Sequence, residues 1–163
     1  MCLGPRRKSS PYSYRVFTAR PPPLVGLAVD RRVEQLLCEV ARWAEETSEV
    51  GAAALVGSHA RGDARPNSDV DLVILSSDPS ALLADPDWPT RFGDFAEDRL
   101  EPYGRLTSRR VRYSSGLEVE FGITGVEWAA EPDDGTFRVA REGLKVLWDP
   151  SGNFKELAAQ ERP

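Results

Sequence analysis

The chain has 163 residues, of which 40% are hydrophobic and 29% are charged, and these values are ordinary for a water-soluble globular protein. This length suits one domain with one hydrophobic core. The formal net charge is −5 at pH 7, whereas proteins that coat nucleic acids are basic, so general nucleic-acid binding is not expected. No apolar run approaches the roughly 20 residues of a membrane span, so no membrane partner is expected either.

The N-terminal residues 1–25 are predicted to be a tail outside a single folded domain that covers residues 26–163. They are rich in Pro and Ser, and three consecutive prolines at 21–23 favour an extended polyproline conformation. They hold five of the 21 basic residues and no acidic residue. Two interpretations remain open, a basic docking arm and a disordered extension.

Cysteine and histidine are too scarce for a disulfide framework or a zinc site, because the chain has only Cys2, Cys38 and His59. The basic start has no apolar segment behind it, so it is not a secretory signal. A cytoplasmic, reducing setting is therefore expected.

The first predicted helix covers about 27–48, with Asp30 as a plausible N-cap. Its apolar residues recur at three- and four-residue steps on one face, namely Val33, Leu36, Leu37, Val40, Ala41 and Ala44. This pattern predicts a packing helix without chemistry of its own. A short buried strand, 52–56, follows it.

A second strand is predicted at 69–75. Because side chains alternate along a strand, Asp69 and Asp71 should share one face with Val73, while Val70 and Leu72 line the other. Both faces are apolar beyond the two acids, as in a central strand covered on both sides.

The rest of the chain continues to mix helices with strands. The expected elements are a loop at 77–86 with one helical turn, a helix at 87–100, strands at 103–113 and 117–124 joined by a hairpin at 114–116, a helix at 136–142, a strand at 144–148 and a helix at 153–160. Strands and helices around one sheet predict the α/β (α+β) fold class.

The first chemical signal is Gly57-Ser58, where the first strand ends and a short helix is expected to begin. A helix start presents free backbone N–H groups and the positive end of the helix dipole, which together attract phosphate. Glycine lets the backbone approach a phosphate closely, and Ser58 adds a hydroxyl donor. Alone, such a pair is also what an ordinary turn contains.

The second signal is the pair Asp69 and Asp71. Two carboxylates on one face of a strand lie about 6–7 Å apart at Cα, and their oxygens can converge on a hard cation such as Mg²⁺. At an effective dielectric near 20, two such charges about 5 Å apart repel by roughly 3 kcal/mol. A solvated surface pair is the alternative, but the apolar residues around the acids argue against it.

Together the two signals match a known pattern. An apolar residue, Gly-Ser, ten residues and then Asp-apolar-Asp-apolar resemble the signature of the DNA polymerase beta-like nucleotidyltransferase superfamily. The run over residues 56–72, VGSHARGDARPNSDVDL, is similar to its small bacterial branch of minimal and antibiotic nucleotidyltransferases. The resemblance implies a mixed, mostly antiparallel central sheet flanked by helices, and two Mg²⁺ ions on three carboxylates. It also implies transfer of a nucleoside monophosphate from an NTP, with ATP as the expected donor, to an acceptor hydroxyl.

The same resemblance implies roles for individual residues. Gly57 and Ser58 would hold the nucleotide phosphates, and Asp69 and Asp71 would bind both metal ions. Arg61 is a further nucleotide-binding candidate that either clamps phosphate or pairs with a nearby acid. Ser68 would orient Asp69 or the loop before it.

The third carboxylate is expected on a later, adjacent strand, where Glu118 and Glu120 share a face. Glu120 is favoured because it lies between the bulky apolar residues Val119 and Phe121, and Glu118 is the alternative. One carboxylate of the trio, by preference Glu120, could also act as general base on the acceptor hydroxyl.

Three functions remain open. The first is modification of a small molecule such as an antibiotic, for which the acidic chain suits a cationic acceptor and a homodimer could complete the acceptor site. The second is an antitoxin-type protein that binds or AMP-modifies a partner toxin. The third is a catalytically inactive nucleotide-binding scaffold, against which the retention of two mutually repelling acids argues.

Overall fold

The computed structural model describes residues 30–160, so the predicted tail at 1–25 lies outside the described residues. The elements are α1 (Arg31–Glu46), β1 (Val50–Val56), α2 (Gly57–Arg61), β2 (Val70–Ser76), α3 (Pro79–Ala84), the 3₁₀ helix η1 (Trp88–Phe92), β3 (Phe95–Tyr103), β4 (Leu106–Tyr113), β5 (Glu118–Gly125), α4 (Glu127–Ala130), α5 (Asp134–Glu142), β6 (Leu144–Trp148) and α6 (Asn153–Ala159).

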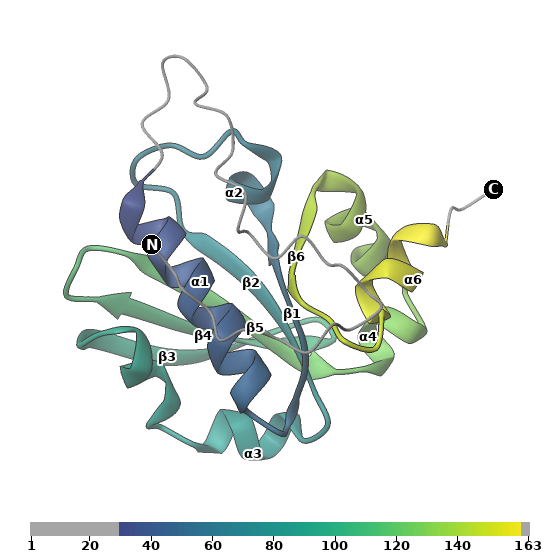
Figure 1. Cartoon of the computed structure of the whole chain (residues 1–163), viewed down its shortest axis with the longest axis horizontal. Coiled ribbons are helices and arrows are strands. Elements are labelled where there is room, and N and C mark those ends of the chain that lie inside the picture. Colours follow the sequence, from purple (N-terminus) through teal and green to yellow (C-terminus); the bar gives the residue numbers. More distant parts are fainter. Residues whose placement is uncertain (1–29, 161–163) are drawn as a thin grey trace.

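The strands form one sheet in the order β3-β4-β5-β2-β1-β6. Every neighbouring pair is antiparallel except β2 and β5, which run parallel. The parallel pair lies in the middle of the sheet, where both faces can be covered. The predicted fold class, a mixed and mostly antiparallel sheet flanked by helices, is confirmed (Figure 1).

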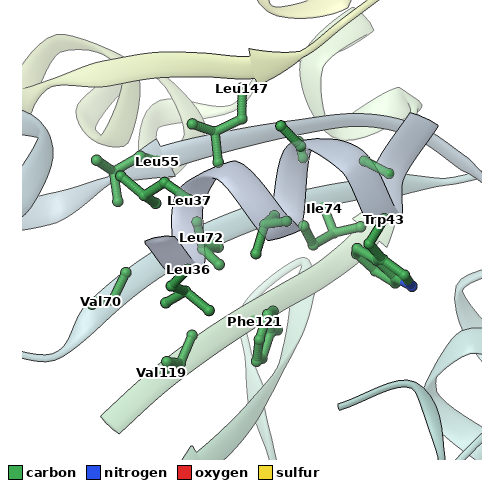
Figure 2. Close-up of a cluster of buried hydrophobic side chains, with 14 of the residues drawn as sticks. Leu36, Leu37, Trp43, Leu55, Val70, Leu72, Ile74, Val119, Phe121 and Leu147 are labelled. Carbon is green, nitrogen blue, oxygen red and sulfur yellow. The ribbon is translucent and has the colours of Figure 1, made fainter. Parts of the chain in front are cut away.

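Helix α1 covers one face of the sheet and forms the larger core. Figure 2 shows Leu36, Leu37 and Trp43 of this helix packed among strand residues such as Leu72 and Phe121. The predicted apolar stripe is buried as expected. Leu82 of α3 and Trp88 of η1 extend the same core, and Trp88 meets Phe121 edge-on with 4.9 Å between ring centroids.

Asp30 is the N-cap of α1, as predicted, because its side chain accepts a hydrogen bond from the Arg32 amide at 2.9 Å. Asp30→Ala should lower the free energy of unfolding by about 1 kcal/mol, since one orphan donor of the helix loses its partner. Urea denaturation measures this change. Asp30→Ser is the control and should retain most of the stability, because a serine hydroxyl can cap the same amide. An equal loss in both variants would contradict the capping role.

The opposite face of the sheet is divided. Over β1 and β2, a second core packs Val73 and Leu75 against Trp128, Phe154 and Leu157, and Figure 1 shows α4, α5 and α6 grouped beside β6 on this side. Over β3, β4 and β5, the face carries charged side chains instead, including Glu101, Arg110, Arg112, Glu118 and Glu120. Val73 and Leu75 therefore share their face with Asp71, as the alternation predicts.

The prediction of a helix at 87–100 is wrong. The chain forms η1 and then β3, which runs along the edge of the sheet and pairs with β4 from Phe95 to Tyr103. Gly93, with φ +133°, separates the two elements. The apolar residues of this segment do not share one buried face, because Trp88 is buried whereas Leu100 is 49% exposed. Backbone hydrogen bonding to β4 decides the conformation here, not the spacing of apolar residues.

A buried arginine fastens β3 to the rest of the fold. Arg109 of β4 is 4% exposed and holds Asp98 of β3 through Nε at 2.9 Å and Nη2 at 2.6 Å. Its Nη1 donates to the Asp85 carbonyl at 2.5 Å, and its guanidinium lies 5.2 Å from the ring centroid of Trp88. The paired charge thus secures an edge strand that has little apolar burial of its own.

None of the helices within residues 30–160 has both the length and the apolar composition needed to cross a bilayer.

Candidate active site

The Gly57-Ser58 turn begins α2 directly at the end of β1. Gly57 has φ +70°, in the left-handed region that favours glycine. The short helix closes after one turn, where the amides of Gly62 and Asp63 both donate to the Ser58 carbonyl at 3.0 and 3.1 Å. Ser58 is only partly buried.

Gly57 also lies against Asp71, because β1 and β2 pair Val56 with Asp71. A Cβ atom at position 57 would collide with the Asp71 carboxylate and would lie 3.2 Å from its Cγ. Position 57 therefore requires glycine for two reasons, the positive φ of its backbone and the close approach of Asp71. The Gly-Ser turn and the Asp-x-Asp strand form one continuous site.

Asp71 and Glu120 are direct neighbours, since the parallel register of β2 and β5 pairs them at Cα. Burial, followed by the charges of Glu120 and Asp69, raises the pKa of Asp71 to about 6. Burial also raises the pKa of Glu120, against the opposing charge of Arg110. The two carboxylates therefore form a partly desolvated acidic pair that favours a neutralising partner.

In the structure that partner is Arg110 of β4. Its Nη1 contacts Glu118 at 2.6 Å and Asp69 at 3.2 Å, its Nη2 pairs with Glu120, and its Nε lies 3.6 Å from Glu101. The Glu118 hydrogen bond and the surrounding carboxylates raise the pKa of Arg110 further above its ordinary value. One guanidinium thus contacts acids from the loop before β2, from β3 and from β5.

Sequence reasoning did not single out Arg110 among Arg109, Arg110 and Arg112. The hairpin register contained the signal, because it pairs Arg110 with Glu120 and Arg112 with Glu118. Arg109 points to the opposite face. Arg109 and Arg110 therefore lie on opposite faces of β4, where Arg109 pairs with Asp98 and Arg110 pairs with Glu120.

Glu118 differs from Glu120 in its surroundings. Its hydrogen bond to Arg110 holds its pKa below the usual range, and Arg112 contacts it at 3.3 Å. It lies at the start of β5, next to the hairpin turn. Glu120 is the acid aligned with Asp71, whereas Glu118 is an ion-pair partner of two arginines.

The donor set suits a hard divalent cation, although residues 30–160 hold no ready-made group of three His, Cys, Asp or Glu side chains for a metal ion. Carboxylate oxygens are what Mg²⁺ prefers. The pKa of Asp71 is raised by burial and then by the like charges of Glu120 and Asp69, and a cation would offset both effects. Arg110 contacts two of the three predicted ligands, Asp69 and Glu120.

The remaining predicted residues lie on α2 and the loop that follows it. Arg61 pairs with Asp63 at 3.2 Å and approaches Glu142 at 4.0 Å, which matches the ion-pair alternative. The Ser68 hydroxyl accepts from the Arg65 amide at 2.8 Å and so shapes the loop before Asp69. His59 Nε2 lies 3.3 Å from the Ser68 carbonyl. The His59 contact links α2 to the loop before Asp69.

Comparison with known proteins points to one family. The family model described as "Nucleotidyltransferase domain" matches residues 37–120, which is just over half of the chain. This segment runs from α1 through the Gly-Ser turn and the Asp-x-Asp strand to Glu120. No curated protein matches the chain.

Several solved structures are similar at low identity. An aminoglycoside 6-adenyltransferase from Bacillus subtilis aligns with a TM-score of 0.48 and 10% identity over 64% of this chain and 38% of that one. Cid1 in complex with the UTP analogue UMPNPP gives 0.46 and 13% over 69% and 32%. The apo form of a CCA-adding enzyme gives 0.44 and 15% over 80% and 32%. The chain thus spans about a third of the length of these proteins.

Proposed function

We propose a specific reaction for this chain, which belongs to the nucleotidyltransferase domain family. It transfers a nucleoside monophosphate from an NTP, with ATP as the donor, to the hydroxyl group of a small-molecule acceptor. The observation that carries the proposal is the contiguity of the site, in which Gly57 packs on Asp71 and Asp71 aligns with Glu120. The Gly57-Ser58 turn, which we propose binds phosphate, and the acidic pair of Asp71 and Glu120 therefore lie next to each other.

In this reaction the acceptor oxygen forms a bond to the α-phosphorus of the NTP. The bond from that phosphorus to the oxygen bridging to the β-phosphate breaks, and pyrophosphate leaves. The proton of the acceptor hydroxyl passes to Glu120 as general base. A carboxylate within reach of the acceptor hydroxyl can take up this proton in the transition state.

Asp69, Asp71 and Glu120 are proposed to hold two Mg²⁺ ions. When bound, such ions supply Lewis acidity and offset the negative charge that develops on the leaving pyrophosphate. The protein's own part is to hold the NTP phosphates at the Gly57 and Ser58 amides and to present three carboxylates. Asp71 and Glu120 come from the adjacent strands β2 and β5, and Asp69 comes from the residue just before β2.

The acceptor is proposed to be a cationic small molecule, such as an antibiotic. On the charged face around the site the acids outnumber the arginines with which they pair. The acids are Asp69, Glu97, Glu101, Glu118 and Glu120, and the arginines are Arg99, Arg110 and Arg112. The chain as a whole is also acidic. Opposite charge would draw a cationic acceptor to this face and repel an anionic one. Modification of a partner protein is the alternative that the same assay detects.

The first test is ligand-induced stabilisation. MgATP should raise the melting temperature of the wild-type protein, by an amount that corresponds to about 2.7 kcal/mol when the ligand is 100-fold above its Kd. The doubly substituted Asp69→Asn/Asp71→Asn protein should show no such shift. Equal shifts in both proteins would remove the metal site from the proposal.

The second test is transfer itself. The protein is incubated with α-labelled ATP, Mg²⁺ and a panel of cationic and neutral hydroxyl compounds, and labelled product and pyrophosphate are measured. Label on a cationic small molecule is the expected result. Label on a protein of the source cell would favour the partner-modifying alternative, and the lack of label and of pyrophosphate under every condition would reject the enzyme.

A further inference from the structure

Arg110 is the central charged group of the site, and the reaction proposed above gives it no task. We infer that Arg110 is an internal counter-cation that competes with the divalent cation for Asp69 and Glu120, and that Glu118 and Glu101 retain its guanidinium when those two carboxylates bind the cation. The inference rests on the proposed function and assigns a positioning role to three residues, Arg110, Glu118 and Glu101.

The four acids around Arg110 fall into an inner and an outer pair. The inner pair, Asp69 and Glu120, belongs to the predicted cation ligands and contacts Nη1 and Nη2. The outer pair is Glu118, 2.6 Å from Nη1, and Glu101, 3.6 Å from Nε. A guanidinium that leaves the inner pair therefore still has two carboxylates within reach.

Competition follows from the chemistry of the oxygens. A guanidinium hydrogen-bonded to a carboxylate uses the lone pairs that a hard cation requires for coordination. Two positive charges held by the same carboxylates would also repel each other. A bound cation and an Arg110 that contacts the inner pair therefore compete, and each stabilises the acidic site without the other.

The contact between Arg110 and Glu101, one of the outer pair, is incomplete. Arg110 Nε is buried and has no hydrogen-bond partner among the described residues, and its distance of 3.6 Å to Glu101 is too long for a hydrogen bond. A small displacement of the guanidinium toward β3 would complete this bond and release the inner pair. When the inner pair binds the cation, we therefore expect the Arg110 guanidinium to stay in the site and not to move into solvent.

The chain offers a matched control in Arg112. This residue lies two positions along β4, on the same face, and pairs with Glu97 at 3.8 Å and Glu118 at 3.3 Å. Its side chain is 55% exposed, against 24% for Arg110. Arg112→Gln changes the net charge of the face by the same amount as Arg110→Gln and leaves the inner pair with its guanidinium.

The experiment measures Mn²⁺ binding to the nucleotide-free protein by the loss of the free-ion signal in electron paramagnetic resonance. Arg110→Gln should bind Mn²⁺ about tenfold more tightly than wild type, the size of a typical coupling between competing ligands. Arg112→Gln should stay within about twofold of wild type, as expected for an exposed charge. Arg110→Lys keeps the charge and loses the planar fork, so its affinity should be intermediate.

A double substitution tests the retaining role of Glu118. Glu118→Gln should weaken Mn²⁺ binding in the wild-type background, because Arg110 then stays on the inner pair. The same substitution should have a smaller effect when Arg110→Gln is already present, since there is no guanidinium left to retain. Equal effects in the two backgrounds would remove Glu118 from the inference.

The outcomes separate this inference from the proposed function. Mn²⁺ binding that depends on Asp71 but is not tightened by Arg110→Gln, or is tightened equally by Arg112→Gln, overturns the counter-cation role and leaves the proposed metal site in place. The lack of Mn²⁺ binding to wild type and to all variants, including Arg110→Lys, overturns the metal site and this inference with it. Circular dichroism spectra confirm that each compared variant is folded.

Discussion

Asp71→Asn is expected to reduce nucleotidyl transfer by about 10³-fold or more, which is a typical loss when one preorganised electrostatic group is removed from a catalytic site. Asp71 is the residue that links the two halves of the site, since it touches Gly57 and aligns with Glu120. Asparagine keeps the shape but loses the charge. The measurement is single-turnover transfer with α-labelled ATP, once an acceptor is identified.

The same variant should be more stable than wild type at neutral pH in the absence of ligand. The pKa of Asp71 is raised from 3.8 to about 6 in the folded protein, so the folded state binds a proton more strongly than the unfolded state does. The stability from this group is therefore complete below about pH 4 and is lost as pH rises through about 6. Asp71→Asn removes that loss, with an expected gain of about 1–2 kcal/mol at pH 7.5 after allowance for solvent screening.

Urea denaturation at pH 4.5 and pH 7.5 measures this gain, which should be largest at the higher pH. Asp63→Asn is the control, because Asp63 is 63% exposed and pairs with Arg61 outside the acidic pair. It should show no gain at either pH. A variant at position 71 that is less stable than wild type at pH 7.5 would show that Arg110 fully compensates the acidic pair. The expected combination, more stable and inactive, is typical of a residue retained for function.

The central part of the site was predictable because it depends on local rules. Alternation along residues 69–75 predicts Asp69 and Asp71 on one face. In the structure Val73 and Leu75, on the same face of β2 as Asp71, belong to the second core. The preference for Glu120 over Glu118 came from its apolar neighbours. In the structure Glu120 is the residue aligned with Asp71, although the identity of the third ligand stays a prediction.

The errors arose where contacts between distant segments decide the structure. The apolar residues of 87–100 recur at helical spacing, yet hydrogen bonds to β4 and the pairing of Asp98 with Arg109 produce an edge strand. Arg110 was missed for a related reason. Its role depends on carboxylates from β3, from β5 and from the loop before β2, and only the partner Glu120 follows from the hairpin register. Local periodicity contains no information on the other pairings.

Gly57→Ala is expected to reduce transfer by about 10²-fold or more, the cost of a catalytic group displaced by about 1 Å, and to remove most of the stabilisation by MgATP. A Cβ at position 57 would displace the Asp71 carboxylate. Because that carboxylate is the end of a side chain, it can rotate away without unfolding the sheet. The stability loss should therefore be about 1–2 kcal/mol, mainly from alanine at positive φ.

Gly62→Ala separates backbone strain from the collision. Gly62 lies in the same short turn with φ +82°, but a Cβ there would have no atom within 4 Å. Both alanine variants should thus lose similar stability in urea denaturation, while only Gly57→Ala loses transfer and the MgATP response. If Gly62→Ala were equally inactive, rigidity of the turn would account for both losses. If the close approach of Gly57 to Asp71 is what matters, only the Gly57→Ala variant should lose function.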